Sequence, residues 1–338
     1  MTIATLILTW NGADVVLDCL RTIAYQQHQP DMNLVVDNAS TDATVTRIRQ
    51  HFPTVALIEN PTNLGFARGM NIGITALNRM SDPPDIVVLL NQDTLLDPEC
   101  LAAMVAPLRE DPKIAAVGGK IRYPDGTIQH AGAYLEWPRA VTHHTGWHEP
   151  DTGQYDQPRS CDMVTAAAIA LRMEALQTVG LFDPGYSPAY YEDADLCWRL
   201  RYHGYQIVYQ PAAVLTHHES LSIKDGTLRS SYYNRGRLRL VLKTYPYQDI
   251  IAPFAESELA FIRTHGYAME ARALRWAYLA TLGNLNDIAQ ARQGLQPALT
   301  SEQLDGLAHF LIQCKQELTR TLYHRAHTTL SAVRFHLS

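Results

Sequence analysis

The first third of the chain alternates short apolar runs with stretches of helical periodicity, and this restricts the possible folds strongly. Apolar runs of strand length recur at Ile3–Leu8, Asn33–Val36, Ala56–Ile58, Ile86–Leu90 and Ala115–Val117. Between them lie helical patterns, such as Ala13–Tyr25 with its apolar Val16, Leu20 and Ile23. Alternating strands and helices form a mostly parallel sheet covered by helices on both faces. We therefore predict an α/β fold of this type.

Polar loops follow four of these strands: Thr9–Gly12, Asp37–Asp42, Asn60–Gly65 and Asn91–Asp93. Because the carboxyl ends of parallel strands meet at one edge of a sheet, the loops are expected to line one polar cleft. Each loop alone also fits a turn or a helix cap, since Asn, Asp, Ser and Gly favour both. Four such loops at one edge favour a ligand site.

The loop after Ile86–Leu90 is the most informative of the four. A carboxylate (Asp93) beside an amide (Asn91) suits a divalent cation that holds phosphate oxygens. The alternative is that Asp93 only begins the turn into the helix near Pro98. A dinucleotide-binding loop is not expected, because residues 9–14 contain a single glycine and the chain has no P-loop motif.

Composition excludes several classes of protein. The 338 residues are 46% hydrophobic and 18% charged, which is enough for a real core in one or two domains. A net charge of −6 gives no reason to expect a nucleic-acid partner. The five cysteines lack a C-x-x-C pair, as in a reducing compartment. Without a basic leader or an apolar run of about 20 residues, we predict a cytoplasmic protein, with peripheral contact to the inner face of the plasma membrane left open.

Five blocks carry a resemblance to a known family: Leu6–Asn11, Val35–Asp42, Asn63–Asn71, Leu89–Asp93 and Tyr190–Arg199. In this order they resemble the family-2 glycosyltransferases, and most closely the rhamnosyltransferase-like branch that builds bacterial surface polysaccharides. The resemblance ends near Ser220 and so covers roughly two thirds of the chain. It implies a GT-A fold, with a nucleotide-sugar-binding, Rossmann-like sheet over residues 1–220.

The resemblance also implies an activity: metal-dependent transfer of a hexose from a UDP- or dTDP-sugar to an acceptor hydroxyl, with inversion. The acceptor would be a glycan or a lipid-linked glycan, and dTDP-rhamnose is the branch's commonest donor. Eight residues would contact the nucleotide: Thr9, Asn11, Asp37, Asn38, Asn63, Arg68, Asn91 and Gln92. For Arg68, an exposed helix arginine is the alternative.

The family's Asp-x-Asp metal motif is altered here, because Asn91 stands at its first position. An amide oxygen brings no charge, so Asp93 should be the principal ligand of Mg²⁺ or Mn²⁺. The family commonly adds a histidine after a late strand. We expect this to be His217 in preference to His218.

Asp193 is the general base that the resemblance implies, with Glu192 and Asp195 as supporting neighbours. All three could instead complement the N-terminus of the following helix. Crowding by other carboxylates, together with partial burial, is expected to raise the pKa of Asp193.

Two further segments are expected near the substrates. The small residues Thr165–Ala168 match a family segment that passes close to the donor sugar, and residues 126–155 are expected to border the acceptor. Within the latter, His143, His144 and His148 have a spacing that zinc could use, but their Gly- and Pro-containing loop argues against it.

Residues 221–338 are predicted to be mostly helical, with helices over Ser257–Asn284 and Ser301–Leu337. The segment Lys224–Lys243 is basic and amphipathic through Arg229, Arg235, Arg237, Arg239 and Lys243. It suits an anionic membrane or a lipid-pyrophosphate acceptor, or else forms a solvated helix face packed on the sheet domain. An oligomer contact is a further use of this region.

Two other functions compete with glycosyl transfer. A non-catalytic nucleotide- or carbohydrate-binding relative could act as a scaffold in glycan assembly, but such a relative is expected to lose Asp93 or Asp193, and both are present. Sugar-nucleotide synthesis would require a glycine-rich N-terminal loop, which residues 9–14 do not provide.

Overall fold

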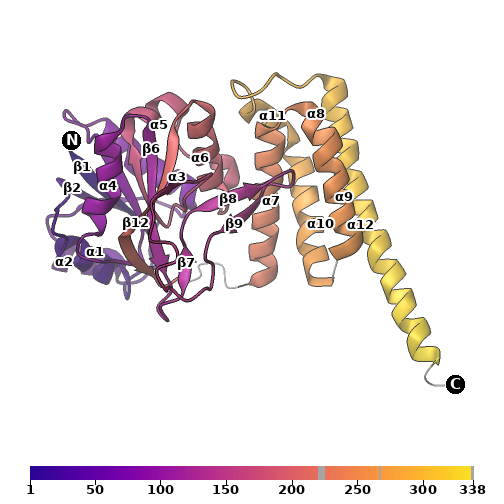
Figure 1. The fold of residues 1–338 in the computed structure, drawn as a ribbon, viewed down its shortest axis with the longest axis horizontal. Coiled ribbons are helices and arrows are strands. Elements are labelled where there is room, and N and C mark those ends of the chain that lie inside the picture. Colours follow the sequence, from indigo (N-terminus) through magenta and orange to yellow (C-terminus); the bar gives the residue numbers. More distant parts are fainter. Residues whose placement is uncertain (220–224, 266–267, 336–338) are drawn as a thin grey trace. The chain divides into compact units, whose positions relative to one another are not determined.

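The computed structural model describes residues 1–219, 225–265 and 268–335. The chain divides into two compact units: Met1–Leu135 with Thr142–Ser220, and Glu136–Val141 with Leu221–Ser338 (Figure 1). The first unit contains the large sheet, and the second is helical.

The sheet of the first unit has ten strands, and its main path runs β10-β12-β6-β11-β4-β1-β2-β3, with β5 paired to β12 and β7 to β6. The strands are β1 (Ile3–Thr9), β2 (Met32–Asp37), β3 (Ala56–Glu59), β4 (Ile86–Asn91), β5 (Thr94–Leu96), β6 (Ile114–Arg122), β7 (Ile128–His130), β10 (Arg159–Ser160), β11 (Ala168–Arg172) and β12 (Gln206–His217). A separate two-stranded sheet pairs β8 (Ala133–Glu136) with β9 (Val141–His144).

Six strands of the main path run in one direction: β3, β2, β1, β4, β6 and β12. Strand β11 lies between β4 and β6 and is antiparallel to both. Strand β10, at the edge of the main path, is also antiparallel to its neighbour β12. The expected mostly parallel α/β sheet is therefore confirmed, with two reversed strands that the alternation of elements did not reveal. The helices of this unit are α1 (Val16–Ala24), α2 (Thr44–His51), α3 (Phe66–Asn78), α4 (Cys100–Glu110), α5 (Met173–Val179) and α6 (Glu192–Tyr202).

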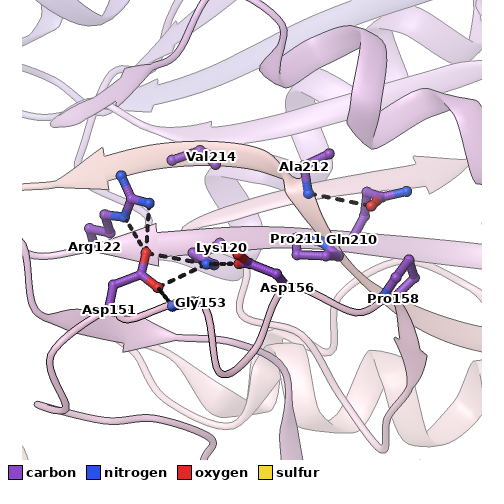
Figure 2. Close-up of a pocket in the computed structure, with 10 residues that line it drawn as sticks. All are labelled: Lys120, Arg122, Asp151, Gly153, Asp156, Pro158, Gln210, Pro211, Ala212 and Val214. Carbon is purple, nitrogen blue, oxygen red and sulfur yellow. Dashed lines mark hydrogen bonds and ion pairs between the residues drawn. The ribbon is translucent and has the colours of Figure 1, made fainter.

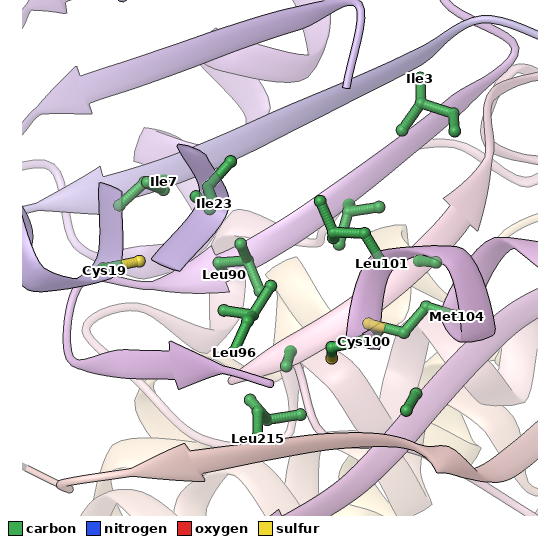
Figure 3. Close-up of a cluster of buried hydrophobic side chains, with 14 of the residues drawn as sticks. Ile3, Ile7, Cys19, Ile23, Leu90, Leu96, Cys100, Leu101, Met104 and Leu215 are labelled. Atoms are coloured by element: carbon green, nitrogen blue, oxygen red, sulfur yellow. The ribbon is translucent and has the colours of Figure 1, made fainter. Parts of the chain in front are cut away.

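Apolar side chains on both faces of the central strands form the core. On one face, Ile7 and Leu90 pack with Ile23 of α1 and Leu101 of α4 (Figure 3). On the other face, Gly69 and Gly73 of α3 lie against Leu8 and Leu6, where an added Cβ would clash. Helices cover both faces, which explains why β1 and β4 are almost continuously apolar.

The second unit contains α7 (Gly226–Thr244), α8 (Tyr247–Asp249), a π-helical turn (Ile250–Phe254), α9 (Ala255–His265), α10 (Ala268–Gly283), α11 (Leu285–Ala291) and α12 (Ser301–Phe335). The expected helical segment 257–284 is thus occupied by two helices, α9 and α10. None of the helices in the described ranges combines the length and the apolar character needed to cross a bilayer.

The basic segment 224–243 does not present all of its positive side chains to solvent. Arg237, Arg239 and Lys243 of α7 are all buried, so they are not available to a lipid surface. Arg239 forms an ion pair of 2.6 Å with Asp287, and Arg237 pairs with Glu258 of α9. Lys224 lies outside the described residues. Sequence periodicity did not show that much of this positive charge would be used inside the unit.

Glu258 is the centre of this buried network. It is fully buried and accepts hydrogen bonds from Arg237 (3.0 Å), Arg139 (2.9 Å) and the Tyr278 hydroxyl (2.6 Å). Burial alone would raise the pKa of Glu258, but the two arginines and Tyr278 outweigh it and lower the pKa from 4.5 to about 2. The network links the short segment 136–141 to α7, α9 and α10.

We expect Glu258→Gln to lower the free energy of unfolding of this unit by about 3–5 kcal/mol, because it leaves buried arginines without their counter-charge. Since the pKa is lowered on folding, the stabilisation is complete above about pH 4.5 and is lost as the pH falls towards about 2. Urea unfolding followed by circular dichroism between pH 7 and pH 3 measures both effects. Glu256→Gln, at an exposed position on the same helix, is the matched control, and equal stability of the two variants would contradict the assignment.

Candidate active site

The predicted polar loops lie along one edge of the main sheet. Strand register aligns Thr9 with Asp37, Asp37 with Glu59, and Leu8 with Asn91. Because β12 runs parallel to these strands through β6, His217 at its carboxyl end reaches the same edge. Ligands bind at this edge in open α/β sheets.

Hydrogen bonds join the first two loops into one rim. The Asn11 side chain accepts from the Thr41 backbone N–H (2.8 Å), and the Asn11 N–H donates to the Ser40 hydroxyl (2.8 Å). Asn11 has a φ of 47°, a left-handed conformation that asparagine tolerates. Asp37 is buried and accepts from the Ser40 N–H (2.9 Å) and from the Ser40 hydroxyl.

The third and fourth loops are tied to this rim by amide side chains. Asn38 is buried and donates to the Gly65 carbonyl (3.1 Å), while Gln92 accepts from the Thr9 hydroxyl (2.6 Å). Asn63 is exposed and accepts from the Gly65 N–H (2.9 Å). Arg68 is exposed on α3 and makes no hydrogen bond or ion pair with the residues that the structure describes. The structure thus brings Thr9, Asn11, Asp37, Asn38 and Gln92 together, and leaves Arg68 open to solvent.

Asp93 and His217 meet although they follow strands that are not neighbours in the sheet. After β4 the chain turns and forms β5, which pairs antiparallel with β12 so that Thr94 lies opposite His217. The His217 Nε2 is 3.2 Å from the Asp93 Oδ1 and 3.3 Å from the Asn91 Nδ2. Both Asp93 and His217 are buried. His218 instead has an exposed side chain, and only its backbone N–H contacts the Asp93 carbonyl (3.1 Å).

Gln129 of β7 orients the His217 ring. Its Oε1 lies 2.7 Å from the His217 Nδ1, and because a carbonyl oxygen only accepts, the Nδ1 carries the proton. The Nε2 is therefore directed towards Asn91 and Asp93. Ligating histidines are commonly held in this way by a second hydrogen bond. Sequence reasoning missed Gln129, for which the only signal was its place in the 126–155 segment.

The donor atoms at this point suit a divalent cation. A carboxylate and an amide oxygen are ligands that Mg²⁺ and Mn²⁺ accept, and an imidazole nitrogen is a further ligand for transition metals. Over the described ranges, no group of three or more His, Cys, Asp and Glu side chains could hold a metal. A cation at Asp93 and His217 would therefore complete its coordination with other oxygens, such as those of phosphates or water.

Asp193 lies at the start of α6, after two tyrosines in left-handed conformations, Tyr190 (φ 79°) and Tyr191 (φ 75°). Such backbone strain in non-glycine residues is concentrated at functional sites. The Asp193 carboxylate accepts from the backbone N–H groups of Ala194 (2.8 Å) and Ala166 (3.2 Å). Ala166 belongs to the small-residue segment 165–168, whose Ala167 carbonyl accepts from the Asn91 N–H (2.8 Å).

The pKa of Asp193 is raised, as expected, and burial is the main cause. The two backbone N–H groups that donate to the carboxylate partly oppose the effect. The expected crowding by neighbouring carboxylates was wrong for Asp195, which forms a buried ion pair with Arg199 (2.8 Å) and accepts from the Tyr186 hydroxyl (3.1 Å). Asp195 therefore supports the α6 scaffold. Glu192 is buried in the first turn of the same helix.

The three histidines with zinc-like spacing have three different partners. His143 stacks on Tyr134 with ring centroids 4.9 Å apart, and His148 stacks on Tyr123 at 4.8 Å. The His144 Nδ1 lies 2.9 Å from the Nδ1 of His130 in β7. The structure does not bring these three rings to a common point.

A cavity of about 610 Å³ lies along β6 and β12, beside the loop of residues 151–158 (Figure 2). Lys120 is buried there between Asp151 (3.0 Å) and Asp156, and Arg122 also pairs with Asp151 (2.6 Å). None of the predicted site residues lines this cavity. These ion pairs anchor the 151–158 loop to strand β6.

The fold is that of GT-A glycosyltransferases, as similar solved structures show. The crystal structure of GalNAc-T7 with UDP, GalNAc and Mn²⁺ matches with a TM-score of 0.60 and 15% identity, over 98% of this chain and 57% of that one. A mannosyltransferase from Pyrobaculum calidifontis in complex with GDP-Man and Mn²⁺ matches with a TM-score of 0.51 and 18% identity, over 94% and 86%. At these identities the likeness concerns the fold alone.

The chain belongs to glycosyltransferase-like family 2, whose sequence model matches residues 2–239. The N-acetylglucosaminyl-diphospho-decaprenol L-rhamnosyltransferase of Mycobacterium tuberculosis is 29% identical over 60% of this chain and 71% of that protein. The uncharacterized protein y4gI of Sinorhizobium fredii is 31% identical over 56% and 21%, and the O-antigen biosynthesis protein RfbC of Myxococcus xanthus is 30% identical over 44% and 12%. The chain thus matches only a small part of the last two.

Proposed function

We propose that this protein transfers a sugar from a nucleotide-diphosphate sugar to an acceptor hydroxyl, with inversion at the anomeric carbon, in the synthesis of a bacterial surface polysaccharide or glycolipid. The observation that carries the proposal is the contact between Asp93 and His217 beside the polar rim of the first two loops. A thymidine- or uridine-diphosphate sugar is the expected donor. dTDP-rhamnose is the first candidate, because a related protein is named as a rhamnosyltransferase.

Asp93 and His217 would hold Mg²⁺ or Mn²⁺, with Asn91 beside them. When bound, such an ion supplies positive charge that stabilises the departing diphosphate. Gln129 would assist by holding the His217 ring so that its Nε2 is directed at Asp93. The two solved GT-A structures described above contain Mn²⁺.

The other residues bind the donor and move one proton. The rim around Asp37, Asn38 and Asn11 would hold the nucleoside, and Arg68 is free in solvent at the start of α3 to meet a phosphate. Asp193 would take the proton of the acceptor hydroxyl as its oxygen bonds to the anomeric carbon and the bond to the diphosphate breaks. No covalent intermediate with the protein is required.

The acceptor would be a glycan or a lipid-linked glycan, as in the name of the mycobacterial relative. Peripheral contact with the inner face of the plasma membrane is part of this proposal. It would not use the buried Arg237, Arg239 and Lys243. A non-catalytic scaffold is the second candidate, and the pairing of Asp93 with His217 together with the raised pKa of Asp193 favours the enzyme over it.

A donor screen tests the proposal. The full chain is incubated with dTDP-rhamnose, UDP-glucose, UDP-N-acetylglucosamine and GDP-mannose, each with Mn²⁺, Mg²⁺ or EDTA. We expect thermal stabilisation and slow release of the nucleoside diphosphate with a thymidine or uridine donor, only when metal is present. Binding without turnover in every mixture, including those with acceptors, would favour the scaffold, and no binding at all would contradict both functions.

A further inference from the structure

A hydrogen-bonded pair of histidines lies within residues 126–155, the segment expected from the sequence to border the acceptor. His130 of β7 is fully buried, and its Nδ1 is 2.9 Å from the Nδ1 of the partly exposed His144 of β9. The two rings meet edge to face, with centroids 4.9 Å apart and an angle of 70°. The distance is that of a hydrogen bond, so one Nδ1 carries a proton and the other accepts it.

The surroundings of His130 decide which nitrogen is the donor. Its second nitrogen, Nε2, is buried and has no hydrogen-bond partner among the described residues. A buried N–H group without an acceptor is rare and costly, so the proton of His130 is expected on Nδ1. The Nδ1 of His144 must then accept, and the proton of the neutral His144 ring is left on its Nε2.

The same pair keeps His144 uncharged. Burial, followed by the nearness of two other basic groups, His144 and Arg159, lowers the pKa of His130 well below 6.5. Burial also lowers the pKa of His144, aided by His143 and opposed by Asp193 and Glu219. A charged His144 would carry protons on both nitrogens and would force His130 to move its proton to the unpartnered Nε2. His144 is therefore a neutral group whose Nε2–H is its available donor.

Hydrogen bonds connect the end of β9 to Asp193 through two intervening segments. The Thr145 N–H donates to the Gly132 carbonyl (2.9 Å), the neighbouring Ala133 N–H donates to the Met163 carbonyl (3.0 Å), and the Ala166 N–H donates to Asp193 (3.2 Å). No hydrogen bond joins His144 and Asp193 directly in the described parts of the chain. The Asp193 oxygens accept from Ala166 and Ala194 instead. A sugar that places one hydroxyl at Asp193 would find in His144 a donor for a second oxygen.

We propose that His144 is an acceptor-binding residue: its Nε2–H donates a hydrogen bond to an oxygen of a hydroxyl-rich acceptor beside Asp193. His130 is the positioning residue that fixes the tautomer of His144. The inference rests on the proposed function for the role of Asp193. The proton of the reacting hydroxyl passes to Asp193, and His144 keeps its own proton throughout.

Steady-state kinetics test the binding role, with the donor identified by the screen and a short-chain lipid diphospho-N-acetylglucosamine as the acceptor probe. His144→Leu is expected to raise the KM for this acceptor roughly ten-fold, the effect of one lost hydrogen bond, while the KM for the donor stays within two-fold. His130→Leu should do the same, and His130→Gln, which retains a donor group, should restore most of the wild-type value. His51→Asn, at the exposed end of α2, is the control.

The tautomer is tested separately by the ¹⁵N chemical shifts of the histidine rings at pH 7, assigned with the same variants. We expect a protonated Nδ1 in His130, and in His144 a protonated Nε2 with a bare Nδ1. A charged His144, the opposite tautomer, or an unchanged acceptor KM in His144→Leu would overturn the inference. Failure of the wild-type protein to transfer any sugar would instead count against the proposed function, and the ring shifts would still decide the tautomer.

Discussion

Asp193→Asn is expected to reduce sugar transfer roughly a thousand-fold or more while nucleotide binding stays close to that of the wild type. The substitution removes the group that accepts the proton and changes the shape of the side chain little. Asparagine has one oxygen, so it can accept from only one of the two N–H groups, of Ala166 and Ala194, that the carboxylate satisfies. A loss of stability of about 1 kcal/mol is therefore expected and is measured by thermal unfolding.

The pH dependence gives a second test of the same residue. A base must be deprotonated to act, so the rate should fall as the pH drops through the pKa of Asp193. Since burial raises this pKa, the fall is expected at a higher pH than for an exposed aspartate. Asp18→Asn, on the exposed side of α1, should retain the wild-type rate and profile. Turnover near the wild-type level in Asp193→Asn would exclude its role as the base.

Asp93→Ala is expected to weaken the metal-dependent binding of a nucleoside diphosphate by roughly 10- to 100-fold. The variant removes the carboxylate that we propose as a metal ligand and leaves the His217 Nε2 and the uncharged Asn91. Isothermal titration with UDP and dTDP, in Mn²⁺ and in EDTA, separates the metal-dependent part of the affinity from the rest. In EDTA the variant and the wild type should bind equally weakly.

Two further variants and a control show whether the lost affinity comes from the proposed metal site. His217→Ala should reproduce the loss, and Gln129→Leu should cause a smaller one because it only releases the His217 ring. Asp97→Asn, at an exposed position four residues further along, is the matched control. If Asp93→Ala lost affinity equally in Mn²⁺ and in EDTA, the residue would be a part of the nucleotide rim and not a metal ligand.

The strands and helices of the first unit were largely predictable, because buried strands and amphipathic helices have different apolar periods. Strand β11 was not, since the apolar run Ala168–Leu171 is short and contains no signal for its direction. The buried cations of α7 were missed for a related reason. Periodicity indicates which residues share a helix face, but not whether a partner such as Glu258 will neutralise a charge on the buried side.

In the candidate site too, local sequence patterns predicted some residues and missed others. Its rim residues were found because each follows a strand and has a polar side chain suited to a turn or a ligand. Gln129 and His130 were not singled out, because they belong to a strand of three residues and act through contacts with His217 and His144. Asp195 was grouped with Asp193 by proximity in sequence, yet two residues along a helix are a rotation of roughly 200°, so the two carboxylates have different surroundings, with Arg199 beside Asp195.

The sequence by itself determined the α/β class, the edge at which polar loops gather, and the residue types that could hold a diphosphate and accept a proton. These follow from local patterns, since strand periodicity and loop chemistry are properties of neighbouring residues. Only the tertiary structure decided that the chain after β4 crosses to β12, which sets Asp93 against His217 in preference to His218. It also decided the orientation of the His217 ring and the raised pKa of Asp193. Both depend on burial and on hydrogen bonds between residues far apart in the chain, which no local pattern contains.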